Sequence, residues 1–147
     1  MSAAAARVPI MKKALLITAA TVLSLLGVTP AHAEVVPGCS SARQIGTTGY
    51  AKWPTGQTMA SVKQYAGCGQ NFGYVWVWAD WAAAHPGFHA FAAVRTEDGV
   101  AHGKVQGRLD QREIWSKGTG TTGVCTRGMG WIAVGEDGWQ GLSSKRC

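Results

Sequence analysis

The sequence is poor in charged residues, in proline and in long apolar runs. Asp, Glu, Lys and Arg make up 15% of its 147 residues, and only 5 residues are proline. The longest apolar stretch, residues 14–28, has about 15 residues, whereas a helix that spans a bilayer needs about 20. No C-x-x-C pair occurs, which excludes the common zinc and thioredoxin spacings, and no serine lies in a G-x-S-x-G elbow. We therefore expect no metal, no cofactor and no serine-hydrolase motif.

The first 33 residues have the three parts of a cleavable secretory signal. Lys12 and Lys13 supply the positive charge, residues 14–28 the apolar stretch, and residues 31–33 an A-x-A cleavage site. Cleavage leaves a mature domain of residues 34–147 with no membrane span. The alternative is an uncleaved membrane anchor, which the short apolar stretch disfavours. We expect a secreted, extracellular protein.

The charge of the mature chain is smaller than that of the full sequence. Translation starts at Met1 or at Met11, and in both cases cleavage leaves eleven Lys and Arg residues against eight Asp and Glu, a net charge of +3 rather than +6. No RNA- or DNA-binding motif accompanies this modest charge, so no nucleic-acid partner is expected. One run of basic residues begins in the strand expected at 100–106. We interpret it as a charge-balanced surface loop, and the alternative interpretation is a binding site for a polyanion. The run consists of Lys104, Arg108, Arg112 and Lys117, with Asp110 and Glu113 between them.

All four cysteines lie in the mature part. An even number of cysteines in a small exported chain predicts two disulfides. Of the three possible pairings, Cys39 with Cys68 and Cys125 with Cys147 is favoured because each bond then closes a local loop. In the chain-entropy model each such loop contributes about 3 kcal/mol to stability.

The glycine and tryptophan content favours an all-β fold. The mature part contains nineteen of the 20 glycines and all 7 tryptophans, and it has no convincing helical periodicity. We expect one small antiparallel sandwich or barrel of seven to eight short strands joined by glycine turns. The expected strands are 58–65, 72–81, 88–95, 100–106, 113–116, 129–134 and 139–144, with tight Asp-Gly turns at 96–99 and 135–138.

Aromatic residues are the main candidates for a binding site. Residues 72–81 are apolar on both faces, which predicts a central strand covered on both sides and places Trp76 and Trp78 in the core. The alternative is a stacking platform made by this stripe together with Tyr74 and Trp81. The better candidates for exposed binding rings are those nearer to turns and polar neighbours, namely Trp53, Trp115 and Trp139.

Catalytic patterns are weak. His85 and His89 have an H-x-x-x-H spacing, but Pro86 lies between them and prevents the helix that would aim both rings at one metal. These two histidines could still form a metal or acid–base cluster with Asp80 and His102 if loops brought them together. Such a cluster would lack the glutamate of a metalloprotease motif. The acidic pairs 97–98 and 136–137 lie in turns, where Asp-Gly is needed for geometry alone. We assign no catalytic residue.

Four short motifs suggest a family. They are Cys39 followed by the small residues 40–42, a lysine-bearing strand at 61–65 before Cys68, an asparagine and alternating aromatic residues at 71–78, and an Ala-Val-Arg-Thr-Glu-Asp-Gly hairpin at 93–99. In this order they resemble the small exported proteins of Gram-positive bacteria, mainly actinobacteria, that are grouped as domain of unknown function 2690. The resemblance covers residues 39–129 and leaves the Trp139 hairpin and Cys147 unmatched. It implies an extracellular β-rich domain and transfers no site residue.

Together these observations favour a non-catalytic module that binds an extracellular polysaccharide of the cell wall or the environment, or a protein. The first alternative is a secreted inhibitor of an extracellular hydrolase, in which a disulfide-braced loop at 53–56 or 82–87 enters an active site. The second is a small hydrolase or toxin that uses His85, His89 or His102.

Overall fold

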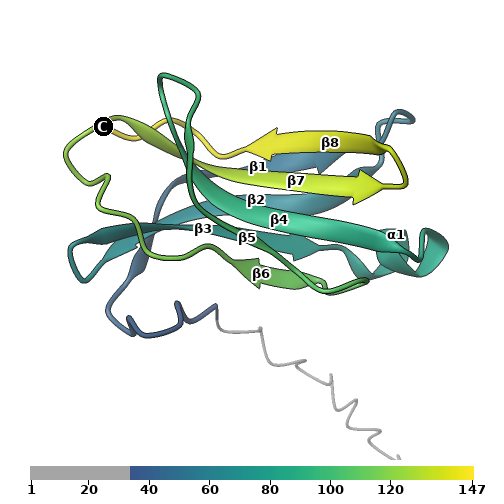
Figure 1. Cartoon of the computed structure of the whole chain (residues 1–147), viewed down its shortest axis with the longest axis horizontal. Helices are drawn as coiled ribbons and strands as arrows, with labels where there is room; N and C mark the ends of the chain where they lie inside the picture. Colours follow the sequence, from purple (N-terminus) through teal and green to yellow (C-terminus); the bar gives the residue numbers. More distant parts are fainter. Residues whose placement is uncertain (1–33) are drawn as a thin grey trace, which may run out of the picture. The chain divides into compact units, whose positions relative to one another are not determined.

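A computed structural model describes residues 34–147 as eight strands and one short helix (Figure 1). The predicted signal, residues 1–33, lies outside the described residues. The strands form two four-stranded antiparallel sheets, in the orders β1-β2-β3-β6 and β5-β4-β7-β8. The elements are β1 (Arg43–Lys52), β2 (Thr58–Gly67), β3 (Gln70–Val77), α1 (Ala79–Ala84), β4 (Phe88–Thr96), β5 (Ala101–Gln106), β6 (Glu113–Trp115), β7 (Thr126–Val134) and β8 (Asp137–Leu142).

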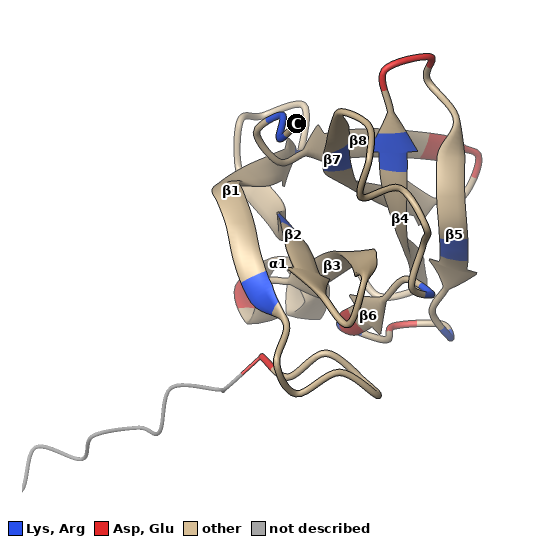
Figure 2. Cartoon of the chain, turned by 90° about the vertical axis from the view of Figure 1, so that its left-hand side faces the viewer, with Lys and Arg blue, Asp and Glu red and all other residues tan. Residues whose placement is uncertain are grey.

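The predicted antiparallel sandwich is confirmed, and the sheets do not close into a barrel (Figure 2). Two details differ from the expected strands. β1 was not expected, and it is an edge strand with mostly exposed or half-buried residues. The strand expected at 72–81 ends at Val77 and is followed by α1, where alanines favour a helix and Asp80 lies in the first turn.

Several glycines lie within strands rather than in turns, and they let the two sheets approach closely. A Cβ atom on Gly73 of β3 would lie 2.0 Å from the carbonyl oxygen of Ala93 in the other sheet. A Cβ on Gly128 of β7 would lie 2.3 Å from the carbonyl oxygen of Lys63 in β2. The expectation that glycines mainly join strands is therefore incomplete, because some of them act in sheet packing.

The interior is apolar at the end of the sandwich near α1. Its core includes Met59, Val77, Trp81, Phe88 and Ile132, all of which are fully buried. A group of rings closes this end. The centroid of Trp53 lies 4.4 Å from that of Trp139, 4.7 Å from that of His85 and 5.7 Å from that of Trp81.

The interior is polar at the opposite end. Gln64 Nε2 donates to Thr126 Oγ1 at 2.5 Å, and Asn71 Nδ2 donates to Thr121 Oγ1 at 3.1 Å. The side-chain oxygen of Gln64 is buried and has no hydrogen-bond partner. Hydrogen bonds, rather than contact between large apolar side chains, therefore organise this part of the interior.

Both disulfides have the favoured pairing, Cys39–Cys68 and Cys125–Cys147. Cys68 follows the last residue of β2, and Cys125 precedes the first residue of β7, which pairs with the end of β4. Both bonds thus lie at the polar end of the sandwich. Two disulfides are compatible with an extracellular protein. Within residues 34–147, no helix is long and apolar enough to cross a membrane.

The outer face of β3 is only partly covered. The segment 34–42 contributes Val36 and Cys39 to a second core that buries Phe72 and Tyr74. The central-strand prediction is therefore confirmed for these two rings. The core placement is wrong for Trp78, whose surface is 46% exposed and which follows the last residue of β3. Trp76 is half-buried against the second core.

Candidate binding face on the second sheet

A row of four side chains crosses the outer face of the β5-β4-β7-β8 sheet. Phe91 of β4 pairs with Gln106 of β5 on one side and with Trp131 of β7 on the other, and Trp131 pairs with Gln140 of β8. Directly paired residues of antiparallel strands point to the same side of a sheet. Because the neighbouring Ile132 is in the core, these four side chains point outward. We call Gln106, Phe91, Trp131 and Gln140 the aromatic row.

The ring of Trp131 lies against a glycine of the next strand. A Cβ atom on Gly138 of β8 would be 2.3 Å from both Cζ2 and Nε1 of the indole, so only glycine leaves room for this position. Trp131 still has 36% of its surface exposed. The ring is therefore held along the sheet while part of its surface is open to solvent, and little side-chain entropy remains to be lost on binding.

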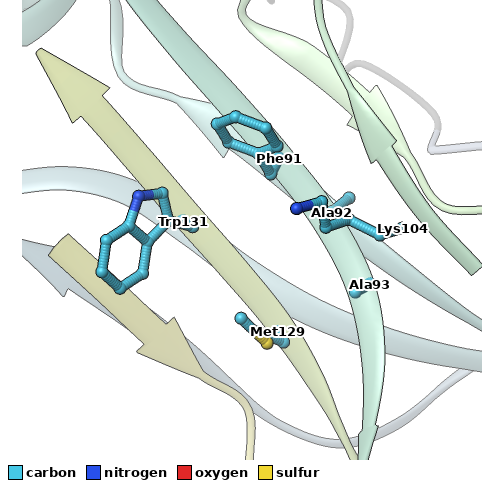
Figure 3. A pocket seen from close by; sticks show the side chains of 6 residues that line it. All are labelled: Phe91, Ala92, Ala93, Lys104, Met129 and Trp131. Atoms are coloured by element: carbon cyan, nitrogen blue, oxygen red, sulfur yellow. The ribbon is translucent and has the colours of Figure 1, made fainter. Parts of the chain in front are cut away.

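An apolar hollow lies beside the row (Figure 3). It has a volume of about 180 Å³ and lies between the rings of Phe91 and Trp131, with Met129 and Ala93 in its lining. Lys104 reaches it from β5, and its ammonium nitrogen lies 5.1 Å from the centroid of the Phe91 ring. This distance is within the range of a cation–π contact. The hollow thus combines two aromatic walls with one positive charge.

The chemistry of this face suits ligand binding. Aromatic rings offer flat apolar surfaces that pack against the C–H face of a sugar ring, and the two terminal glutamines offer amide donors and acceptors for hydroxyl groups. The six residues that line the hollow include no carboxylate, imidazole, hydroxyl or thiol. They can therefore orient a ligand by contact with the two rings and by the charge of Lys104.

The three tryptophans favoured from the sequence lie elsewhere. Trp53 and Trp139 are half-buried in the ring group near α1. Trp115 is half-buried on the other sheet, with its centroid 4.3 Å from that of Tyr74 and 5.0 Å from that of Tyr65. The structure does not bring the three rings into one row. Their role in binding stays a prediction.

Trp131 is not among the tryptophans that the sequence favours for binding. The alternation of β7 indicates two faces, since Met129 and Trp131 alternate with Gly130 and Ile132. The alternation does not say which face is buried. The signal that identifies the row is the pairing of Trp131 with Phe91, and this pairing depends on the register of strands far apart in the sequence.

The second outer face also exposes rings. Tyr50 and Trp78 are each 46% exposed, and Trp78 Nε1 donates to Ser61 Oγ at 3.0 Å. The guanidinium carbon of Arg112 lies 4.7 Å from the centroid of Trp76. Part of the aromatic stripe predicted along 72–81 is therefore accessible, although no pocket with an apolar lining like that beside Trp131 accompanies it among the described pockets.

The three histidines within residues 34–147 each have a structural contact. His85 stacks on Trp81 with centroids 4.7 Å apart, the Nδ1 of His89 lies 3.4 Å from the carbonyl oxygen of Gly107, and the Nε2 of His102 lies 3.1 Å from Thr96 Oγ1. His85 and His102 lie near opposite ends of β4. In the described part of the chain, no group of three or more His, Cys, Asp or Glu residues could hold a metal ion.

Asp98 belongs to the turn between β4 and β5. It accepts hydrogen bonds from Thr96 Oγ1 at 2.5 Å and from the backbone N–H of Val100 at 3.2 Å. These bonds favour the carboxylate and hold the pKa of Asp98 below its ordinary value. The arrangement agrees with the turn role that the Asp-Gly pair indicates.

Comparisons with protein-family models, with curated proteins and with solved structures found no significant match. The resemblance to domain of unknown function 2690 therefore stays a prediction from the four motifs. The candidate site rests on the geometry of the chain itself, and that geometry shows an all-β domain with two disulfides and a fixed aromatic row on its second sheet.

Proposed function

We propose that this protein is a secreted, non-catalytic module that binds an extracellular polysaccharide through the aromatic row. The observation that carries the proposal is the register that places Phe91 and Trp131 side by side between two glutamines. Two adjacent rings offer a surface for successive sugar units of one chain, and the amides at both ends hydrogen-bond to hydroxyl groups.

The fixed position of Trp131 supports this function. A ring held against Gly138 does not need to be ordered when the ligand arrives, which lowers the entropic cost of binding. Export to the cell exterior, where such polymers are found, is the part of the proposal that rests on the signal predicted at residues 1–33. The two disulfides are compatible with it.

A depletion assay tests the proposal. The purified protein is mixed with insoluble peptidoglycan, chitin or cellulose, and the fraction that remains in the supernatant is measured. The double variant Phe91→Ala with Trp131→Ala removes both rings. If each ring contributes about 1 kcal/mol, the variant should bind about thirtyfold more weakly than the wild type.

Trp78→Ala is the matched control, because it removes another exposed tryptophan, which follows β3 of the other sheet and is 46% exposed against 36% for Trp131. We expect this variant to bind like the wild type. The proposal is wrong if the wild type stays in the supernatant with all three polymers. It is also wrong if the variant without Phe91 and Trp131 binds as well as the wild type.

One observation favours the alternative function of an enzyme inhibitor. The loop 53–56 and the segment 82–87, which begins with the end of α1, are joined by the Trp53–His85 contact, and both expose most of their residues. The contacts between the rings hold these two segments in place. The disulfides do not, because both lie at the other end of the strands. A panel of proteases and glycosidases incubated with excess protein should then show at least one loss of activity, and full activity throughout would argue against this alternative.

A further inference from the structure

Two arginines face each other beside the aromatic row. Arg95 of β4 pairs directly with Arg127 of β7, four residues along each strand from the Phe91–Trp131 pair. Both therefore lie on the same outer face of the second sheet, and their strands carry neighbouring basic positions in Figure 2. Like charges directly opposite each other on a sheet are destabilising. Such a pair needs a compensating negative charge.

No carboxylate of the described chain supplies that charge. The ion pairs within residues 34–147 are Lys63 with Glu34 and Lys145 with Glu97, and neither includes an arginine. Glu97 is the one acidic residue in the lining of the cavity that the two arginines share, and its Oε1 already lies 2.8 Å from the Nζ of Lys145. The charges of Arg95 and Arg127 are left without a negative partner.

Both guanidinium groups keep most of their donors free. Arg95 Nη1 donates to the side-chain oxygen of Gln140 at 3.3 Å, and Arg127 Nη1 donates to the carbonyl oxygen of Ser143 at 3.1 Å. A guanidinium group has five N–H donors, so each arginine uses one of them in these contacts and keeps four. Its planar fork matches the paired oxygens of a carboxylate or a phosphate.

The two arginines line a cavity of about 260 Å³. A water molecule occupies about 30 Å³ of liquid, so this volume accommodates a tetrahedral oxyanion or a carboxylate group. The lining carries three positive side chains and one negative side chain, which leaves a charge of +2. Thr96 and Thr126 also line it, but Thr96 Oγ1 donates to Asp98 and Thr126 Oγ1 is hydrogen-bonded to Gln64 in the interior, so the donors of the cavity are the two arginines and Lys145.

We propose that Arg95 and Arg127 form a binding site for oxyanions, namely the carboxylate, phosphate or sulfate groups of a ligand. Gln140 connects this site to the aromatic row, because it belongs to the row and also accepts the hydrogen bond from Arg95. A chain that stacks on Phe91 and Trp131 therefore passes next to the arginines. The preferred ligand is then an acidic polysaccharide, a step that rests on the proposed function.

Inorganic phosphate is the probe for the anion site. The thermal midpoint of the protein is measured as phosphate is added, with sodium chloride at equal ionic strength as the reference. A ligand that binds only the folded state raises the midpoint as its concentration increases. We expect phosphate to raise the midpoint above the chloride reference, and equal midpoints in the two salts would overturn the proposal.

Variants locate the site. The double variant Arg95→Gln with Arg127→Gln should lose the response to phosphate, whereas Arg108→Gln, which removes an exposed arginine outside the cavity, should keep it. Arg95→Lys with Arg127→Lys keeps the charge and loses the forked donors, so it should need about tenfold more phosphate. A wild-type response in either double variant overturns the assignment. If the glutamine variant does not fold, the phosphate response of the lysine variant decides whether the two arginines form the site.

The polymer step is tested separately, by depletion with insoluble pectate, which carries carboxylates, and with neutral cellulose. We expect pectate to bind more protein, and we expect Arg95→Gln with Arg127→Gln to remove the difference. Equal binding to both polymers overturns the acidic-ligand step. Binding to neither of these polymers, nor to peptidoglycan or chitin, together with a phosphate response, overturns the polysaccharide function and leaves the anion site standing. Phe91→Ala with Trp131→Ala should lose polymer binding and keep the phosphate response.

Discussion

Replacement of Gly128 by alanine tests how tightly the two sheets are packed. The new Cβ atom would lie 2.3 Å from the carbonyl oxygen of Lys63, and ordinary contact begins at 3.4 Å, so one backbone must move by 1.1 Å, the difference between the two distances. Gly128 is held on its own side as well, because its N–H donates to Ser143 Oγ at 2.8 Å. No side-chain rotation relieves a clash between two hydrogen-bonded backbones.

Overpacking a well-packed core typically costs 1–3 kcal/mol, and we expect Gly128→Ala to lower the free energy of unfolding by about 3 kcal/mol. For a domain of this size, such a change lowers the thermal midpoint by about 12 °C. Unfolding is followed by circular dichroism during heating and, independently, in guanidinium chloride. The slope of the denaturant transition should not change, since the folded and unfolded states expose nearly the same surfaces as in the wild type.

Two other glycines give a graded comparison. A Cβ on Gly130 would meet the methyl groups of Val62 at 2.6 Å and Val75 at 2.7 Å, and side chains yield more easily than backbone, so Gly130→Ala should cost about 1 kcal/mol. A Cβ on Gly123 would meet nothing within 4 Å, and Gly123→Ala should change stability by less than about 1 kcal/mol. The reasoning is refuted if Gly128→Ala and Gly123→Ala unfold at the same midpoint.

Two further predictions concern the phenols and the second disulfide. Burial is the main cause that raises the pKa of Tyr65, and the hydrogen bond and the charge of Glu34 raise it further. Burial is also the main cause that raises the pKa of Tyr74. Because the folded state favours the protonated phenols, their contribution to stability is complete below about pH 10 and is lost as the pH rises further. The domain should therefore unfold as these two phenols ionise. The test uses Tyr50→Phe, which removes the exposed third tyrosine, and tyrosinate absorbance that rises in this variant while the circular dichroism stays native would contradict the prediction. Cys125→Ser with Cys147→Ser opens a loop with a sequence separation of 22 and should lower the free energy of unfolding by about 3 kcal/mol in urea; an unchanged midpoint would mean that non-covalent contacts alone hold the chain terminus.

Features with local chemical causes could be predicted from the sequence. The two disulfides followed from cysteine spacing, and the hairpin between β4 and β5 followed from the Asp-Gly pair at 98–99. β4 was expected within one residue of its observed bounds, because a proline and a glycine precede it and a turn follows it. In each case, a few neighbouring residues contain the whole signal.

Features that depend on distant pairing could not be predicted. β1 has few apolar residues and contains Gly46 and Gly49, so its alternation is weak, and it is a strand because β2 offers an open edge. The six residues of α1 are too few for a helical period to be recognised. The aromatic row needs the register of four strands, which residue types near Phe91 or Trp131 do not reveal.

The division of the interior into an apolar and a polar end has a consequence for where the protein can act. Large apolar side chains stabilise the end near α1 by themselves, whereas the end with Gln64 and Thr126 contains both disulfides and also the cavity of Arg95 and Arg127. In a reducing compartment, the cavity end would be the first to loosen. Oxidation of the cysteines is then a requirement for the proposed anion binding, and the protein with reduced cysteines should respond more weakly to phosphate than the oxidised protein.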